Sequence, residues 1–394
     1  MRGDTQSMRI AFYSHDTMGL GHIRRNLSIA RSLVGSINVS ILLISGTHEA
    51  SAFDLPPKCE CLCLPSLEKS LEGHYQSRRL GIGLKELVAL RSATIRAALQ
   101  SFAPDVFIVD KAPRGVLGEL DSSLEMLRSR GNTRCVLGIR DVLDEPDRVD
   151  NEWQSENNVA AANRYYDTVW VYGDPRVYDT IKTCRSLSQL HADVFFTGYL
   201  CPRGSTNRIV NSRPVEDGSA LCLVGGGQDG IALARAFAIC NLGRRTGTIV
   251  TGPFMAREAI REVERYAADN RALRVVRFVP DLRPLIQQAS HIITMGGYNT
   301  VCELLGSEKH VLIVPRVIPR KEQAIRADRL RAMGVLDSIE PAKLDADYLT
   351  DWLDTGAIRE NARGVNIDLD GLSRLPGLLQ SVASQPISGL QAIA

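Results

Sequence analysis

Short apolar runs alternate with amphipathic segments along the chain. In the first half, the runs are rich in β-branched and aromatic residues, as expected of strands buried on both faces of a sheet. These candidate strands are 8–14, 38–44, 59–64, 106–109, 135–139, 168–171 and 194–196. Segments with apolar residues at helical spacing lie between several of them, at 22–33, 84–102, 115–128 and 151–165. This alternation predicts a parallel sheet covered by helices on both faces.

A polar stretch rich in Pro, Gly and Ser, 201–218, separates this half from a second series and predicts a linker. Beyond it, candidate strands lie at 220–224, 247–251, 275–279, 292–293 and 311–314, and candidate helices at 231–242, 257–267, 281–288 and 323–331. A chain of 394 residues suits two domains. We therefore expect an α/β fold of two Rossmann-like, doubly wound parallel-sheet domains, 8–200 and 219–394, facing a central cleft. The last helix is free to pack back on the first domain.

The stretch 289–305 joins a buried strand to a helix through two glycines. Gly296 and Gly297 follow the apolar run, and Asn299 or Thr300 can cap the helix that continues through Glu303. Such a turn directs free backbone N–H groups at the carboxyl end of the strand, where a phosphate is the usual occupant. Thr300 and Glu303 also have the spacing of a capping box, in which Glu303 would only satisfy the helix's own amides. Both interpretations stay open from this stretch alone.

Another glycine turn leads from the first strand into a helix that begins at His22. Gly19 and Gly21 resemble the start of a dinucleotide fingerprint, but Arg24 occupies the third glycine position and no acidic residue ends the second strand. These departures argue against a nicotinamide site. A histidine at a helix N-terminus is disfavoured as a cation, so a neutral His22 facing a cleft is a candidate general base. A histidine that caps the helix, or contacts a phosphate without moving a proton, is the alternative.

Charged residues follow two further strands of the first half. Asp110 and Lys111 come after one strand, and Arg140 and Asp141 come after the next. Ligands of open α/β sheets bind outside the carboxyl ends of the strands, which places these residues on the functional rim. Mutual salt bridges are the alternative. Three glycine turns would converge on the same cleft, at 19–21, 225–227 and 296–297.

Composition and charge narrow the class of protein. Apolar residues make up 44% and charged residues 23%, as in ordinary soluble globular proteins. A net charge of +2 supplies no basic field for nucleic acid. The nine cysteines form no Cys-x-x-Cys motif and are expected to be reduced core residues. No signal-peptide pattern or membrane-length apolar run occurs, so we expect a cytoplasmic protein, with peripheral membrane contact left open.

The order and spacing of several motifs resemble a known family. The motifs are Gly-Leu-Gly-His at 19–22, Gly-Gly-Gly at 225–227, Phe-Val-Pro-Asp at 278–281, Gly-Gly-Tyr-Asn-Thr-Val-Cys-Glu at 296–303 and Pro-Arg-Lys-Glu-Gln at 319–323. The pattern is similar to GT-B fold glycosyltransferases, in particular the family 28-like enzymes that form lipid II, and to bacterial predicted glycosyltransferases. The resemblance implies transfer of a sugar from a nucleoside-diphosphate sugar, UDP-linked by analogy, to an acceptor hydroxyl. It also implies inversion, and neither a metal nor another cofactor.

The resemblance assigns roles to individual residues. Glu303 would bind the ribose of the donor nucleotide, and His22, with Asp141 as second candidate, would be the catalytic base. The other implied donor-binding residues are Gly226, Gly227, Gln228, Gly297, Tyr298, Asn299 and Thr300 for the diphosphate, Phe278 and Val279 for the base, and Gly19, Gly21, Glu322 and Gln323 for the sugar.

Departures from the family pattern leave the identity of donor and acceptor open. The segment 227–229 replaces a turn that contains a serine in the lipid-II enzymes, and 24–26 replaces a turn that leads into a proline. The basic residues Arg316, Arg320 and Lys321 stand beside the sugar-binding loop. The expected partners are a nucleotide sugar and a small-molecule, lipid or glycan acceptor, with no nucleic acid. A nucleotide-sugar hydrolase of the pseudaminic-acid-pathway type, a sugar-nucleotide 2-epimerase and a non-catalytic GT-B-like binding subunit are the alternatives.

Overall fold

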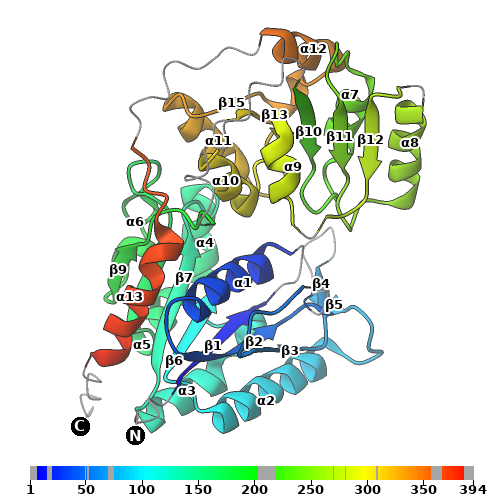
Figure 1. Ribbon diagram of the computed structural model, residues 1–394. Coiled ribbons are helices and arrows are strands. Elements are labelled where there is room, and N and C mark those ends of the chain that lie inside the picture. The colour runs from blue at the N-terminus through cyan, green and yellow to red at the C-terminus, as the bar shows by residue number, and fades with distance from the viewer. Residues whose placement is uncertain are drawn as a thin grey trace, which may run out of the picture.

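Two parallel β-sheets, each with helices on both faces, make up the protein (Figure 1). The computed structural model describes residues 7–15, 20–48, 50, 53–69, 75–202, 218–268, 270–279, 281–307, 309–355 and 366–385. The first sheet has the strand order β3-β2-β1-β6-β7-β8-β9, and the second has the order β12-β11-β10-β13-β14-β15. The expected fold class is therefore confirmed.

The first sheet and its helices occupy the N-terminal half of the chain. Its strands are β1 (Met8–Ser14), β2 (Val39–Ser45), β3 (Cys59–Cys63), β6 (Val106–Asp110), β7 (Arg134–Arg140), β8 (Thr168–Tyr172) and β9 (Asp193–Phe196). A small antiparallel pair is formed by β4 (Leu67–Lys69) and β5 (Tyr75–Ser77). The helices are α1 (Gly21–Val34), α2 (Leu84–Phe102), η2 (Val116–Gly118), α3 (Asp121–Arg130), α4 (Pro146–Ser155), α5 (Asn158–Tyr165), α6 (Thr180–Thr183) and η3 (Leu187–Gln189).

The second sheet and its helices follow in the C-terminal half. The strands are β10 (Ser219–Leu223), β11 (Gly247–Val250), β12 (Leu273–Val276), β13 (Ala289–Thr294), β14 (His310–Ile313) and β15 (Asp337–Ser338). The helices are α7 (Ile231–Ile239), α8 (Arg257–Ala268), α9 (Arg283–Gln288), α10 (Tyr298–Leu305), α11 (Glu322–Ala332), η4 (Pro341–Lys343), α12 (Ala346–Thr355) and α13 (Gly371–Ser384).

Several expected elements differ from the structure. The helix expected over 231–242 ends at Ile239, because Cys240 has an extended backbone. The single helix expected over 151–165 is wrong, because Asn157 adopts a left-handed φ of 54° and separates α4 from α5. The helix expected over 115–128 begins only at Asp121, after the separate turn η2. The strand expected over 275–279 ends at Val276, since its ladder with β11 ends at the pair Val250 and Val276.

Alternating side chains of each strand enter different layers of the core. In β1, Ile10 and Phe12 pack in one apolar cluster with α1 and α13, whereas Ala11 and Tyr13 pack in another with α2 and α3. The first of these clusters continues into α10 and α11 of the second half. One apolar layer therefore runs from the first sheet to the second and holds their facing edges together.

The last helix crosses back to the first sheet. Helix α13, red in Figure 1, packs against α1, and Ser32 Oγ donates to the Leu372 carbonyl at 2.6 Å. The backbones of Leu200 and Asp370 form an isolated antiparallel β-bridge beside this contact. The linker expected at 201–218 lies mostly outside the described residues, and the domain boundaries stay a prediction.

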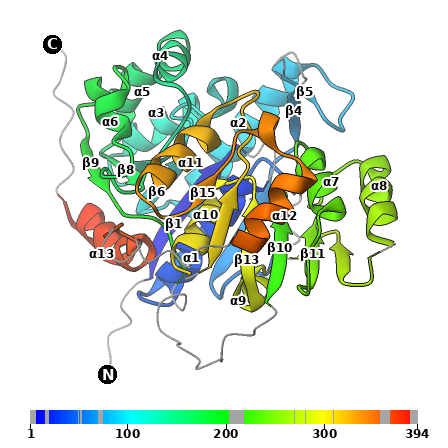
Figure 2. The ribbon, with the colours of Figure 1, turned by 90° about the horizontal axis from the view of Figure 1, so that it is seen from above.

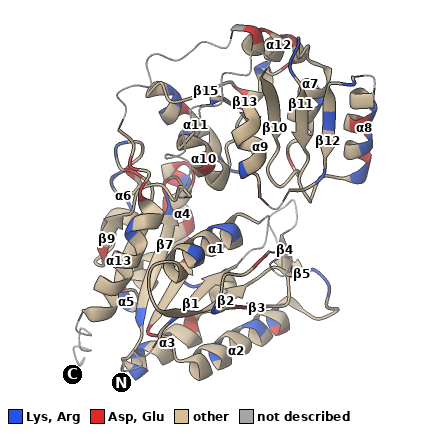
Figure 3. Ribbon diagram, viewed as in Figure 1, with Lys and Arg blue, Asp and Glu red and all other residues tan. Residues whose placement is uncertain are grey.

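Charges of both signs are distributed over both halves (Figure 3). This distribution fits the small net charge of +2. Within the described residues, no helix combines the length and apolar character needed to cross a bilayer.

Candidate active site

The two sheets present the ends of their central strands to one another. In the first sheet the chain order reverses between β1 and β6, and in the second sheet between β10 and β13. A sheet of this kind opens a crevice at the carboxyl end of the strands where the order reverses. Figures 1 and 2 place α10, which follows β13, beside α1, which follows β1, and the two helices are in contact.

His22 and Asp110 meet at the reversal point of the first sheet. His22 lies in the first turn of α1 and Asp110 ends β6, and His22 Nδ1 is 2.7 Å from Asp110 Oδ2. The carboxylate is only 1% exposed and the imidazole 14%. Because an ionised carboxylate can only accept hydrogen bonds, Nδ1 carries the proton of this contact. The second ring nitrogen, Nε2, is then the basic one.

Arg25 holds the same carboxylate in its ionised form. It donates through Nη2 to Asp110 Oδ2, beside the contact with His22. Burial raises the pKa of Asp110, but Arg25 and then His22 outweigh it and hold the pKa well below its usual range. The acid therefore stays charged at neutral pH and fixes the tautomer of the histidine.

The glycine turn after β13 leads directly into α10, as expected for 289–305. Gly296 has a φ of 78°, and Gly297 is the N-cap, with no side-chain cap hydrogen bond. The first backbone N–H groups of the helix belong to Tyr298, Asn299 and Thr300, and such groups have no partner within their helix. They make the N-terminus of α10 a place for negative charge.

Tyr298 and Asn299 connect this turn to the first half. Asn299 Nδ2 donates to the Gly21 carbonyl at 2.8 Å. The Tyr298 ring is buried, with the guanidinium groups of Arg25 and Arg326 5.6 and 5.5 Å from its centroid. The side chain of Tyr298 is therefore part of the contact between the halves, and only its backbone is placed to meet a ligand.

Glu303 is not part of a capping box. Thr300 is the third residue of α10 rather than its cap, so the capping interpretation is wrong. Instead, Glu303 Oε1 accepts from Arg24 Nη2 at 3.1 Å, and Oε2 has no hydrogen-bond partner among the described residues. Burial raises the pKa of Glu303, although Arg24 opposes it. The Glu303 carboxylate, 15% exposed and in the second turn of α10, can therefore accept a hydroxyl hydrogen bond through Oε2.

The other glycine turn of the second half follows β10. Gly227 has a φ of 95°, and a Cβ at this position would lie 2.3 Å from the Thr251 carbonyl oxygen. Gly226 and Gln228 are exposed beside it. Phe278, 38% exposed, lies in the loop after β12, and Val279 packs against the core.

Glu322 and Gln323 begin α11 and hold Arg316. Arg316 Nη2 donates to Glu322 Oε1 at 2.5 Å, and the Arg316 backbone N–H donates to Gln323 Oε1 at 2.9 Å. Burial raises the pKa of Glu322, but Arg140 and Arg316 outweigh it and lower the pKa. The two residues expected to hold the donor sugar thus both contact Arg316.

Asp141 lies in a fully buried ion pair. Its two oxygens accept from Arg326 Nη2 and Nε at 2.6 and 2.8 Å, and Tyr199 Oη donates to it at 2.9 Å. Both charged side chains are 0% exposed. Since Arg326 belongs to α11 and Asp141 follows β7, this pair joins the two halves.

The structure therefore brings His22, Gly21, Asn299 and Glu303 together. Asp141 is enclosed with Arg326, which contacts the Gly296 carbonyl and the Tyr298 ring, so its carboxylate is not exposed to a substrate. Gly19 lies outside the described residues. The sequence placed Asp110 on the functional rim but did not identify it as the partner of His22. Its position directly after a buried strand was the available signal. Among the described residues, no group of three His, Cys, Asp or Glu side chains could hold a metal ion. The expected independence of metals stays a prediction.

Several solved structures share the arrangement of both sheets. UGT2 of Phytolacca americana, complexed with UDP-2fluoro-glucose and pterostilbene, gives a TM-score of 0.61 at 14% identity, covering 96% of this chain and 100% of that one. MurG of Acinetobacter baumannii gives 0.59 at 12% identity, covering 95% and 100%. The chain has the GT-B fold.

The GT-B fold by itself is shared by different activities. A putative UDP-N-acetylglucosamine 2-epimerase from Listeria monocytogenes gives a TM-score of 0.60 at 12% identity, covering 95% of this chain and 96% of that one. No protein-family profile matches the chain, and no curated protein matches it in sequence. The activity must therefore be argued from the site residues and not from the fold.

Proposed function

We propose that this GT-B protein is a glycosyltransferase that moves a sugar from a nucleoside-diphosphate sugar, with UDP as the first nucleotide to test, to an acceptor hydroxyl. The observation that carries the proposal is the His22–Asp110 pair at the mouth of the crevice, 2.7 Å apart and joined to the N-terminus of α10 through Asn299 and Gly21. A base oriented by a buried carboxylate thus lies next to a helix end suited to a diphosphate.

The chemistry assigned to these groups conserves charge and protons. His22 Nε2 takes the proton of the acceptor hydroxyl while the acceptor oxygen bonds to the anomeric carbon from the side opposite the leaving group. The bond to the nucleoside diphosphate breaks, and its electron pair leaves with the phosphate oxygen. The configuration at the anomeric carbon is inverted. Asp110 stabilises the imidazolium that forms.

The second half of the molecule supplies the groups for the donor in this proposal. The backbone N–H groups of Tyr298, Asn299 and Thr300 stabilise the charge that develops on the departing diphosphate. Glu303 accepts from the ribose hydroxyls once Arg24 is displaced or shares the carboxylate. Glu322 and Gln323 bind the sugar hydroxyls, and the loop at Phe278 and Val279 meets the base.

A ligand screen tests the proposal. A ligand that binds only the native protein raises its melting temperature, so UDP, GDP, dTDP and ADP are compared by thermal shift, each with and without a divalent metal. We expect one nucleoside diphosphate to give the largest shift. Its sugar conjugates are then incubated with a panel of hydroxyl acceptors, and the glycosylated product is detected by mass spectrometry. No shift with any nucleotide would remove the donor site and with it the proposal.

Hydrolysis of the nucleotide sugar is the second candidate, because the same His22–Asp110 pair could activate water. His15 lines a cavity of about 460 Å³. The centroid of its ring lies 4.6 Å from that of His22. This volume is far more than a water molecule needs, and it favours transfer to an acceptor. Release of the nucleoside diphosphate at the same rate with and without every acceptor would favour hydrolysis instead.

A further inference from the structure

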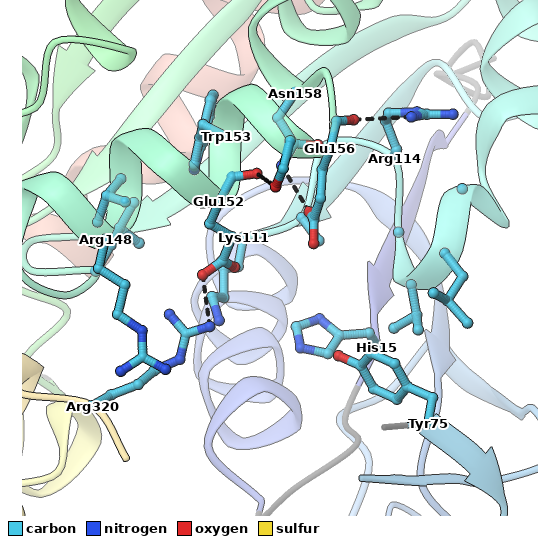
Figure 4. A pocket seen from close by; sticks show the side chains of 18 residues that line it. His15, Tyr75, Lys111, Arg114, Arg148, Glu152, Trp153, Glu156, Asn158 and Arg320 are labelled. Atoms are coloured by element: carbon cyan, nitrogen blue, oxygen red, sulfur yellow. Dashed lines mark hydrogen bonds and ion pairs between the residues drawn. The ribbon is translucent and has the colours of Figure 1, made fainter. Parts of the chain in front are cut away.

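The cavity beside His15 contains more positive than negative charge. Its lining includes four cations, which are Lys111, Arg114, Arg148 and Arg320, and two carboxylates, which are Glu152 and Glu156. All of these residues except Arg320 come from the first half, so the cavity belongs mainly to that half, and Arg320 of the second half borders it (Figure 4).

Three of the four cations have carboxylate partners. Arg114 pairs with Asp121, Arg148 Nε lies 3.3 Å from Asp144 Oδ2, and Arg320 Nη2 lies 2.7 Å from Glu152 Oε2. For the Lys111 ammonium group the structure gives no hydrogen bond or ion pair within the described part of the chain. Figure 4 shows Lys111 next to Glu152 and Arg320 on one side of the cavity, with His15 and Tyr75 across from it.

Lys111 is held in a buried environment that destabilises the charged form of its ammonium group. Lys111 follows β6 directly with a left-handed φ of 71°, and its backbone N–H donates to the Gly138 carbonyl at 2.7 Å. Burial, followed by the nearby Arg320, lowers the pKa of Lys111 to about 8, and Arg140 adds to this effect while Glu152 opposes it. An anion in the cavity would offset the desolvation of this charge.

A second polar group points to a ligand in the same cavity. His15 is 9% exposed and lines the cavity, and its Nδ1 has no hydrogen-bond partner among the described residues. Burial, and then His22 and Lys111, hold the pKa of His15 well below its usual value, so it is neutral. Its contact with the His22 ring connects the cavity to the proposed base.

The remaining lining is apolar or aromatic. Trp153, Val149 and Leu143 are buried core residues that border the cavity, Tyr75 stands at its edge, and Leu117 is 53% exposed. A ligand that fills this space would place an apolar or aromatic body against these side chains. Its charged group would lie at Lys111.

Building on the proposed transferase function, we infer that the acceptor is an amphipathic molecule with an anionic group, a phosphate or a carboxylate, that Lys111 binds in this cavity. An apolar frame rests against Trp153 and its neighbours, and the hydroxyl that receives the sugar lies at the His15 end, toward His22. Lys111 is thus the residue that selects charged acceptors, and it takes no part in the proton transfer.

Binding of small probes tests the inference without knowledge of the natural acceptor. Phenyl phosphate, phenylacetate and the neutral 2-phenylethanol are titrated into the full-length protein, and their dissociation constants are measured by ligand-observed NMR. We expect both anions to bind at least about tenfold more tightly than the alcohol, the effect of one hydrogen bond to a charged group. We expect Lys111→Met to remove that preference while leaving the alcohol unaffected. Lys182→Met removes one exposed charge that is not part of the cavity lining and is the matched control.

Competition distinguishes the acceptor from the donor as the source of the anion. If UDP and phenyl phosphate bind together, the cavity is separate from the diphosphate site, as inferred. If UDP or UDP-glucuronate displaces phenyl phosphate, the anion site belongs to the donor and the inference is overturned. Equal affinity for anion and alcohol, no binding of either anion, or unchanged anion binding by Lys111→Met would also overturn it. Failure of all four nucleoside diphosphates to bind the wild-type protein would count against the proposed function alone, because the probes report on the cavity directly.

Discussion

At the scale of single residues, the chemistry depends on how His22 is held. Asp110 accepts from Nδ1, and Arg25 keeps that carboxylate ionised. The contact leaves Nε2 as the basic nitrogen at the mouth of the crevice. The role of His22 is therefore separable from binding, because neither ring nitrogen is needed to hold a nucleotide at α10.

Replacing His22 tests this role. His22→Ala is expected to lower kcat by about a hundredfold or more, the range of a lost general base, while the nucleotide affinity measured by calorimetry stays within about twofold. Asp110→Asn should lower kcat as well, since an amide cannot stabilise the imidazolium as a carboxylate does. Near-normal turnover of His22→Ala with an authentic acceptor would exclude it as the base.

The proposed contact of Glu303 with the ribose can be tested by a double cycle that combines a change in the protein with a change in the nucleotide. The wild-type protein should prefer UDP over 2′-deoxy-UDP, because a hydroxyl bonded to a carboxylate contributes about 1.5–3 kcal/mol. Glu303→Gln should reduce this preference by about tenfold and leave the affinity for 2′-deoxy-UDP nearly unchanged. Gln323→Ala, which alters a proposed sugar contact, is the control and should retain the preference. If Glu303→Gln weakens both nucleotides equally, Glu303 does not contact the ribose.

The pKa of Lys111, about 8, predicts a pH dependence of anion binding. The ammonium form binds the anion, so the affinity for phenylacetate should be highest below pH 8. It should fall by up to about tenfold per unit as the pH rises further. The charged groups that act on Lys111 are Arg320, Glu152, Arg140 and Glu322, and burial lowers the pKa of Arg140 to about 10, so the measurement stops at pH 9. Lys111→Met should show no change in affinity between pH 7 and 9; a fall of the same size in the variant would assign the effect to another group.

At the scale of elements, two glycines at the ends of neighbouring strands serve different purposes. Gly227 follows β10, where a Cβ would lie 2.3 Å from the Thr251 carbonyl oxygen at a φ of 95°. Gly297 follows β13, where a Cβ would meet nothing within 4 Å. Packing requires glycine at the first position, whereas the second is open to a ligand.

A glycine-to-alanine substitution should therefore lower stability at the first turn and nucleotide affinity at the second. Gly227→Ala is expected to destabilise the protein by about 2 kcal/mol or more, through steric overlap and backbone strain, and to lower the melting temperature. Gly297→Ala should melt within about 1 °C of the wild type, because no contact or φ opposes the methyl group. Its nucleotide affinity should nevertheless fall severalfold, since the methyl group enters the space before α10. Unchanged nucleotide affinity would move the diphosphate away from this turn.

At the scale of the whole molecule, buried and partly buried ion pairs hold the two halves together. Asp141 pairs with Arg326 at 2.6 Å, and Arg320 Nη2 lies 2.7 Å from Glu152 Oε2. Helix α13 adds a second connection through its contact with α1. The relative position of His22 and the N-terminus of α10 depends on these contacts.

Removal of one member of the Asp141–Arg326 pair should destabilise the protein more than removal of both members. Arg326→Met leaves a buried carboxylate without its partner, at a cost of about 3–5 kcal/mol, and should lower the melting temperature strongly. Arg326→Met combined with Asp141→Leu removes both charges and should recover part of that loss. Arg331→Met, an exposed arginine of the same helix, is the control. A double variant as unstable as the sum of both single variants would show that the pair is not coupled.

The sequence alone was sufficient for the fold class, because continuous apolar runs separated by amphipathic segments have few other arrangements than doubly wound parallel sheets. It also located the glycine turn before α10 and the histidine at the start of α1, since glycines and strand ends are local features. The division at Asn157 was missed because a left-handed residue between two helical patterns leaves no periodic signal. The boundaries of the two domains stay a prediction.

Only the tertiary structure decided which strand ends and helices face one another. His22 and Asp110 are 88 residues apart, and Arg24 and Glu303 are 279 apart, so their pairing depends on strand order and on the packing of the two sheets. From the sequence, Asp110, Lys111 and Asp141 have equivalent positions, because each follows a predicted buried strand. Packing separated their roles: Asp110 holds His22, Asp141 is enclosed in an ion pair, and Lys111 borders a cavity without a counterion among the described residues. Hydrophobic periodicity fixes which residues are buried, whereas the direction of a charged side chain depends on partners that are distant in sequence.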